Sequence, residues 1–100
     1  MPFNQLIPRP FTSNGVQIYA PIASGVYGIS NAREWIFIGE TEDIQAALLA
    51  HVQEPDSSMM KRQPTGFVFE ICDQAIRPSR QDRLVCEYGP ACNRQSSRYS

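Results

Sequence analysis

The sequence predicts a small α/β domain of the α+β kind, in which helices flank a three-stranded, mostly antiparallel sheet. Three observations support this fold class. The chain has 100 residues, the length of a single domain. Residues 24–30 (SGVYGIS) and 34–39 (EWIFIG) are rich in β-branched and aromatic residues and are joined by a short polar connection, which is typical of a β-hairpin. The remaining patterns give the order strand, strand, helix, strand, helix, which fits a sheet flanked by helices.

The second arm of the hairpin has apolar side chains on both of its faces. Alternation along a strand places Trp35 and Phe37 on one face and Ile36 and Ile38 on the other. We therefore expect this arm to be a central strand that is covered on both sides.

A third strand is predicted over residues 66–72 (GFVFEIC). Phe67 and Phe69 share one face of this strand, whereas Val68 and Glu70 share the other. This segment completes the predicted sheet.

The first helix is expected to begin at Thr41, a good N-cap residue. Glu42 and Asp43 follow in the first turn, where the helix dipole favours negative charge. The helix ends near residue 53, and its inner face is formed by side chains that recur with helical spacing: Ile44, Ala47, Leu48 and His51.

The second helix is expected to follow an Arg77-Pro78-Ser79 entry. Ser79 is the predicted cap, and Asp82 lies three residues further on, as in a variant of the capping box. The helix runs to about Tyr88 and stops before Gly89-Pro90.

The segments outside these elements divide the chain into three parts. Residues 1–15 are expected to form an extended N-terminal arm, residues 16–93 the domain, and residues 94–100 a polar C-terminal tail. Within the domain, residues 16–19 alternate like a short strand, and the polar, proline-bracketed residues 54–65 are expected to form a loop.

Composition and charge narrow the classes of partner. The formal net charge is −1, so no overall field attracts a polyanion. Up to residue 51 the only cations are Arg9 and Arg33, and the other seven follow later, so the second half could build a local basic surface. The longest aliphatic run is too short to cross a bilayer, and no membrane partner is expected.

The three cysteines indicate the redox compartment. An odd number of cysteines without a recognisable secretion signal is typical of reduced thiols in a cytoplasmic protein. Cys86 is expected to pack within the second helix. A zinc site built from Cys72, Cys86, Cys92 and His51 is the alternative, but no C-x₂-C pair is present to support it.

Several short motifs resemble one known family. Gly25-Val26-Tyr27 and Phe37-Ile38-Gly39 resemble the paired tripeptides of GIY-YIG nucleases. The segment 39–44 (GETEDI) resembles the family's G-x-T/S-x-N-L helix entry, and residue 51 is a histidine where many members have one. Leu84-Val85, Pro90 and Asn93 resemble the closing L-I-x₄-P-x₂-N segment, so that the resemblance spans residues 24–93.

The resemblance implies a site for phosphodiester cleavage. In such nucleases a glutamate on the last helix holds one divalent metal, an arginine on the first helix stabilises the phosphate, and the first tyrosine activates or orients the attacking water. A histidine and the terminal asparagine support the site. Because the attack builds negative charge on the phosphate oxygens, a metal and a guanidinium are well suited to stabilising it.

This sequence matches the family pattern at some of those positions and departs from it at others. Tyr27, His51 and Asn93 match the family pattern, whereas Phe37, Ala47 and Gln81 stand for the second tyrosine, the arginine and the metal-binding glutamate. The resemblance therefore implies a vestigial site. Each matching residue also has a structural interpretation: a buried tyrosine, a hydrogen-bonded helix histidine and an asparagine that fixes the chain after Pro90.

Other charged residues could compensate for the two losses. Asp82 is adjacent to Gln81, but one step along a helix turns a side chain by about 100°, so we expect Asp82 to point elsewhere. Glu40 and Glu70 are nearer the predicted sheet, and Arg80 and Arg83 lie on the last helix.

Three functional hypotheses follow. The first is a catalytically degenerate, nuclease-like pseudoenzyme without a cofactor, which binds protein or nucleic acid, in the latter case through Arg77, Arg80 and Arg83. The second is a divergent DNA endonuclease that uses Mg²⁺ or Mn²⁺ and a relocated carboxylate. The third is a homo-oligomer formed through exposed aromatic residues, with Phe3, Phe11 and Tyr19 as candidates.

Overall fold

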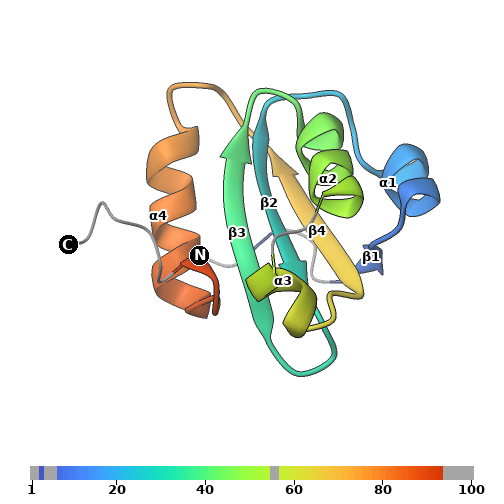
Figure 1. Cartoon of the computed structure of the whole chain (residues 1–100). Coiled ribbons are helices and arrows are strands. Elements are labelled where there is room, and N and C mark those ends of the chain that lie inside the picture. The colour runs from blue at the N-terminus through green and yellow to red at the C-terminus, as the bar shows by residue number, and fades with distance from the viewer. Residues whose placement is uncertain (1–2, 4–6, 55–56, 94–100) are drawn as a thin grey trace.

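The computed structural model describes residue 3 and residues 7–54 and 57–93, so the predicted tail and parts of the arm lie outside the described residues. Figure 1 shows the arrangement of its helices and strands. In chain order the elements are β1 (Arg9–Pro10), α1 (Ser13–Tyr19), β2 (Gly25–Ser30), β3 (Trp35–Thr41), α2 (Ile44–Gln53), α3 (Ser57–Lys61), β4 (Gly66–Ile71) and α4 (Arg77–Tyr88).

The three predicted strands form the main part of an antiparallel sheet, which confirms the α+β class. The two-residue β1 adds a fourth strand, and the order across the sheet is β1-β4-β2-β3. The central strand is β2, whose six residues are all buried, and not the second hairpin arm as predicted. That arm, β3, has apolar residues on both faces because helices cover both sides, but it lies at the edge of the sheet.

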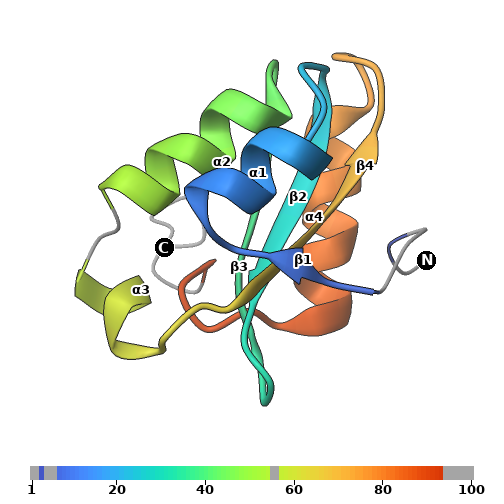
Figure 2. The same cartoon turned by 90° about the vertical axis from the view of Figure 1, so that its right-hand side faces the viewer.

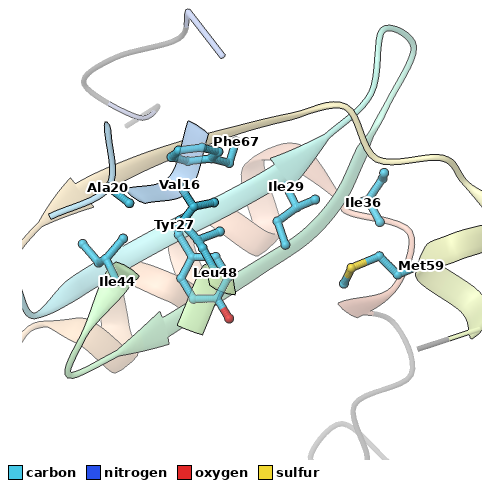
Figure 3. Packing of buried hydrophobic residues seen from close by; sticks show 9 residues of the cluster. All are labelled: Val16, Ala20, Tyr27, Ile29, Ile36, Ile44, Leu48, Met59 and Phe67. Carbon is cyan, nitrogen blue, oxygen red and sulfur yellow. The ribbon is translucent and has the colours of Figure 1, made fainter. Parts of the chain in front are cut away.

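Helices lie on both sides of the sheet, with α1 and α2 on one side and α4 on the other (Figure 2). Each side has its own buried cluster. The larger cluster lies toward α1 and α2, and Figure 3 shows its members: Val16, Ala20, Tyr27, Ile29, Ile36, Ile44, Leu48, Met59 and Phe67. The smaller cluster lies toward α4 and contains Phe3, Val26, Ile38, Val68 and Leu84.

A β-bulge changes which side chains of β3 share a face. Ile29 pairs with Phe37, but the next residue of β2, Ser30, pairs with Trp35, so that Ile36 is an extra residue in the ladder. Ile36 and Phe37 consequently both pack in the larger cluster, while Trp35 belongs to the smaller one. The predicted alternation was wrong for both Trp35 and Ile36, which exchange faces relative to Phe37 and Ile38, because it assumed an uninterrupted strand.

The segment 16–19 is helical, so the predicted short strand was wrong. Helix α1 begins after Thr12, whose Oγ1 accepts a hydrogen bond of 2.9 Å from the Gly15 N–H. A Cβ at Gly15 would collide with the carbonyl oxygen of Pro10, so a glycine lets the helix pack against the preceding strand. Val16 is then fully buried against the core.

The predicted loop 54–65 contains the short helix α3. Its residue Met59 is only 1% exposed and belongs to the larger cluster. Two adjacent methionines in an otherwise polar segment give no periodic signal, which is why the helix was missed.

The two long helices begin at residues other than those predicted. Thr41 still belongs to β3, and Asp43 is the N-cap of α2, accepting a 3.0 Å hydrogen bond from the Ala46 N–H. Helix α4 begins at Arg77, two residues before Ser79, and has no side-chain cap. Its predicted end is confirmed, because Gly89 adopts the left-handed conformation with φ of 56°.

Two of the three candidate oligomer contacts are internal. Phe3 is 2% exposed and stacks on the rings of Trp35 and Tyr88, at centroid distances of 5.6 and 5.9 Å. Phe11 packs against the larger cluster, and only Tyr19 is exposed, beneath the guanidinium of Arg9. The prediction that Phe3 and Phe11 are exposed was therefore wrong.

The cysteines form no disulfide bond. Cys86 is exposed on α4, which contradicts the prediction that it packs. Within the part of the chain that the structure describes, helices are too short or too polar to span a bilayer.

Candidate functional site

The matching tyrosine and histidine meet on the α2 side of the sheet. Tyr27 lies in β2 and is 5% exposed, and its hydroxyl is 2.9 Å from Nε2 of His51 on α2. The ring of Phe37 lies beside both, with centroids 6.0 Å from Tyr27 and 5.2 Å from His51. Which of the two atoms donates the hydrogen bond depends on the histidine tautomer.

Gly39 creates the space for this hydroxyl. It lies directly opposite Tyr27 in the β2–β3 ladder. A Cβ at Gly39 would lie 2.6 Å from the Tyr27 hydroxyl and 2.8 Å from Cε2 of Phe37. The second tripeptide therefore ends in glycine for a steric reason, which the sequence pattern alone did not reveal.

The environment keeps the Tyr27 hydroxyl protonated. Burial raises the pKa of Tyr27 well above its usual range, and the nearby Glu40 carboxylate raises it further. The hydroxyl can therefore serve as a hydrogen-bond partner at neutral pH, but not as an anionic base.

Two of the three carboxylates considered as candidate metal ligands, Glu40 and Glu70, are paired with guanidiniums. Arg77 is 9% exposed, its Nε lies 2.9 Å from Oε1 of Glu40, and its Nη1 donates to Oγ of Ser24. The Arg77 Nε–H does not have hydrogen-bond geometry toward that carboxylate, so the contact is electrostatic. Arg80 binds Glu70 in a bidentate manner, with distances of 2.7 and 2.8 Å.

The pairing of Arg80 and Glu70 is nearly buried. Each side chain is 12% exposed, and the hydrogen bonds that Arg80 donates to Glu70 raise the pKa of the Arg80 guanidinium. Two of the three arginines proposed for nucleic acid, Arg77 and Arg80, thus already contact carboxylates. Only Arg83 lies on the exposed surface of α4, beside the exposed Asp82.

Gln81 and Asn93 meet at the backbone of one β3 residue. Asn93 is 9% exposed, and its Oδ1 accepts a 2.6 Å hydrogen bond from the Ile38 N–H while its Nδ2 donates a 2.8 Å hydrogen bond to the Ile38 carbonyl. The Nε2 of Gln81 donates to the same carbonyl at 3.1 Å. Because the acceptor is a carbonyl oxygen, the facing atom of Gln81 must be its amide nitrogen.

The chain around Asn93 also closes the sheet edge. The N–H groups of Ala91 and Cys92 donate to the carbonyls of Trp35 and Ile36, at 3.1 and 2.8 Å. The exposed side of β3 is thereby covered, as edge strands require.

Ala47, at the position that the resemblance assigns to the arginine, packs against the larger cluster. The structure therefore brings Tyr27, Phe37 and His51 together, and separately joins Gln81 to Asn93. Among the residues that the structure describes, no three His, Cys, Asp or Glu side chains gather in a way that could hold a metal ion.

The fold is shared with known nuclease domains. No family model matches the chain, and no curated protein matches it. Solved structures of the GIY-YIG N-terminal endonuclease domain of UvrC from Thermotoga maritima do match it. A Tyr-to-Phe point mutant of that domain, bound to its catalytic divalent cation, superposes with a TM-score of 0.67 at 17% identity, covering 79% of this chain and 92% of the other.

Two further structures of the same domain agree. An Asn-to-Ala point mutant has a TM-score of 0.67 at 16% identity over 79% of this chain and 91% of the other. The magnesium-bound form gives 0.67 at 16% identity over 79% and 92%. The chain is therefore an α+β domain with the GIY-YIG fold.

Proposed function

We propose that this chain is a catalytically degenerate GIY-YIG-fold domain, which acts as a binding module and does not cleave nucleic acid. The observation that carries this proposal is the contact of Gln81 with the Ile38 carbonyl. The position that the resemblance assigns to the metal-binding glutamate is occupied by a neutral hydrogen-bond donor to the sheet. Hard cations such as Mg²⁺ rely on the negative charge of carboxylates, and the neutral amide of Gln81 supplies no such charge, so the residue at this position does not fit a divalent metal.

The electrostatics of the site support the same proposal. Cleavage requires positive charge that is free to meet the phosphate, but Ala47 supplies none, and Arg77 and Arg80 are next to Glu40 and Glu70. Loss of one electrostatic stabiliser typically lowers turnover by about 10²–10³-fold. Loss of both the guanidinium and the metal ligand leaves no described group to stabilise the transition state.

The chemistry of Tyr27 points in the same direction. At its ordinary pKa near 10, about one tyrosine in 10³ is ionised at pH 7. Burial and Glu40 raise this pKa, so the ionised fraction is smaller still. A buried phenol bound to His51 is accordingly a structural partner in this site.

A nuclease assay with Mg²⁺ and Mn²⁺ tests the proposal directly. We expect the chain to show no turnover of single- or double-stranded DNA or RNA above the level of its own Tyr27→Phe variant. Turnover that Tyr27→Phe abolishes would refute the degenerate assignment, because it could not come from a contaminating nuclease.

Restoring the missing charges gives a second test. The double variant Ala47→Arg, Gln81→Glu is expected to gain metal-dependent cleavage. Ala46→Arg, Gln81→Glu is the matched control, since Ala46 is the exposed neighbour of Ala47 on α2. Equal cleavage by the unsubstituted chain and the Ala47 double variant would show that these two positions do not limit activity.

One observation favours the divergent endonuclease as a second candidate. The charge of Glu40 raises the pKa of Tyr27, so a carboxylate lies within electrostatic range of the tyrosine, although Glu40 is paired with Arg77 of α4. In this case Mn²⁺ would selectively broaden the NMR signals of residues around Tyr27, and Glu40→Gln would abolish the broadening. Unchanged signals at millimolar Mn²⁺ would exclude this candidate.

A further inference from the structure

A polar cavity of about 310 Å³ lies at the hairpin end of the sheet. Three segments that are distant in the sequence line it: the hairpin turn 31–34, the end of α3 with its following turn (58–63), and residues 91–92. Figure 3 shows Met59 of α3 beside Ile36, close to the hairpin, so α3 is anchored in the core at this end.

The side chain of Asn31 connects two of these segments. Its Oδ1 accepts hydrogen bonds from the N–H groups of Arg33 and Glu34, at 2.8 and 2.9 Å. Its Nδ2 donates a 2.6 Å hydrogen bond to the carbonyl of Arg62. The hairpin turn and the end of α3 are therefore held in a fixed relation around the cavity.

The turn after α3 has an unfavourable backbone conformation. Gln63 has φ of 55°, and no other non-glycine residue in the described part of the chain has a positive φ. This conformation is uncommon for a residue with a Cβ, and the following Pro64 restricts Gln63 further. Such conformations cluster at ligand-binding and switch regions, and Gln63 lines the cavity.

The cavity has an excess of positive charge. Arg33, Lys61 and Arg62 line it, and Glu34 is the one carboxylate among the lining residues, which leaves a net charge of two. Glu34 binds Arg62 at 3.0 Å. The residues that the structure describes form no ion pair or hydrogen bond with the side chains of Arg33 and Lys61, both of which are exposed. These two cations are thus available to a ligand.

We propose that this cavity binds a phosphate monoester. Such a group carries a charge of about −1.5 to −2 at pH 7 and has three strong acceptor oxygens, which matches the excess charge of the cavity. A guanidinium binds phosphate through two parallel hydrogen bonds, and an ammonium group adds a point charge. The volume is at the lower end of the range of small-molecule sites, about 300–1,000 Å³, which suits a ligand of mononucleotide or sugar-phosphate size.

Titration of the full chain by two-dimensional NMR tests this site. Phenyl phosphate is the probe, and phenyl sulfate, a monoanion of similar shape, is the ligand control. We expect saturable shifts of the amide signals of residues 31–34 and 61–63, with a Kd of about 1 mM or tighter for the phosphate. The sulfate should bind at least about fivefold more weakly, because it carries half the charge.

Substitutions at exposed residues distinguish specific binding of the phosphate in the cavity from non-specific electrostatic attraction to surface cations. Arg33→Gln and Lys61→Gln are each expected to weaken phenyl phosphate binding by about tenfold, as for a lost charged hydrogen bond. Arg83→Gln removes the same charge from the exposed face of α4, outside the cavity, and should leave the Kd unchanged. Equal weakening by Arg83→Gln, or the absence of saturable binding, would overturn the proposal.

The same titration identifies the source of the phosphate. A 5′-phosphorylated tetranucleotide that binds at these residues more tightly than its 5′-hydroxyl form would place the monoester on a nucleic-acid end. Tighter binding of phenyl phosphate than of the 5′-phosphorylated tetranucleotide would indicate that the monoester belongs to a small molecule. Equal affinity for the two oligonucleotides, at or above that for phenyl phosphate, would show that the cavity recognises backbone diesters and would refute a monoester site.

Discussion

Replacing Asn93 by alanine tests whether this residue holds the sheet edge. Its side chain makes two hydrogen bonds with one residue of β3, accepting from the Ile38 N–H and donating to the Ile38 carbonyl. Both backbone groups are on the side of β3 that faces away from β2, because antiparallel strands alternate the direction of their amides. Asn93 therefore does for β3 what a further strand would do.

The expected loss of stability in Asn93→Ala depends on which hydrogen bonds the Ile38 N–H and carbonyl keep. The Ile38 carbonyl keeps the hydrogen bond from Gln81 in the Asn93→Ala variant, whereas the N–H loses the acceptor that Asn93 provides. The hydrogen bond to the carbonyl contributes about 1 kcal/mol, and leaving the N–H desolvated without its acceptor costs about 1–3 kcal/mol, which gives an expected loss of about 2–4 kcal/mol in the free energy of unfolding. For a domain of this size the melting temperature would fall by roughly 10–20 °C.

Urea denaturation followed by circular dichroism measures this loss, with Gln81→Ala as the matched control. The control removes only the second donor to the Ile38 carbonyl and should cost about 0.5–1 kcal/mol. The double variant leaves the carbonyl without either donor, so its loss should exceed the sum of the single losses. A stability of Asn93→Ala within about 0.5 kcal/mol of the unsubstituted chain would refute the reasoning.

Three further predictions concern the core and the tyrosine. Met59→Ala should lower the free energy of unfolding by about 2–4 kcal/mol, because Met59 is buried in the larger cluster. The 60% exposed Met60 is the control and should tolerate alanine with a loss below about 0.5 kcal/mol. Equal effects of the two variants in urea denaturation would contradict the placement of α3. Gly39→Ala should cost about 1–3 kcal/mol in the same assay, because its new Cβ would displace the Tyr27 hydroxyl; a neutral effect would show that the contact is loose. The pKa of Tyr27 is raised in the folded chain, so the stability that the neutral hydroxyl contributes is present below about pH 10 and is lost as the pH rises above that value. Urea titrations from about pH 9 to 11 should therefore show a steeper loss of stability in the unsubstituted chain than in Tyr27→Phe. Equal dependence of stability on pH in the two proteins would contradict the burial of the hydroxyl.

The elements that the sequence predicted well are those with strong local signals. The hairpin, the third strand and the end of α4 at Gly89 are marked by β-branched runs, alternation and a C-terminal glycine. Helix α1 and the Ile36 bulge could not be found in this way. The conformation of α1 depends on the packing of Gly15 against Pro10, and the bulge depends on how β3 pairs with β2, so both are decided by tertiary contacts.

In the candidate site, too, the sequence predicted what local motifs mark and missed what depends on tertiary contacts. Motif spacing gave the positions of Tyr27, His51 and Asn93, and the structure shows what each side chain contacts. The ion pairs of Glu40 with Arg77 and of Glu70 with Arg80 were not predicted, because each joins a strand to α4 in a manner that depends on how the helix lies on the sheet. The sequence indicated Glu40, Glu70 and Arg80 as candidates for compensation and Arg77 as a candidate contact for nucleic acid, but only geometry could show that these residues pair with one another.

These contacts explain which motif residues this chain has and which it lacks. Gly39 and Asn93 match the family pattern, and each has a reason that belongs to the fold: Gly39 leaves room for the Tyr27 hydroxyl, and Asn93 closes the edge of β3. Ala47 and Gln81 differ from the pattern at the two positions whose charges the resemblance assigns to phosphate and metal. Alanine at residue 47 packs in the core, and glutamine at residue 81 adds a hydrogen bond to the sheet, so both substitutions are compatible with the fold. The contacts that hold this sheet together therefore do not depend on the two charges that the resemblance assigns to these positions, so the proposed degeneracy is compatible with an intact fold.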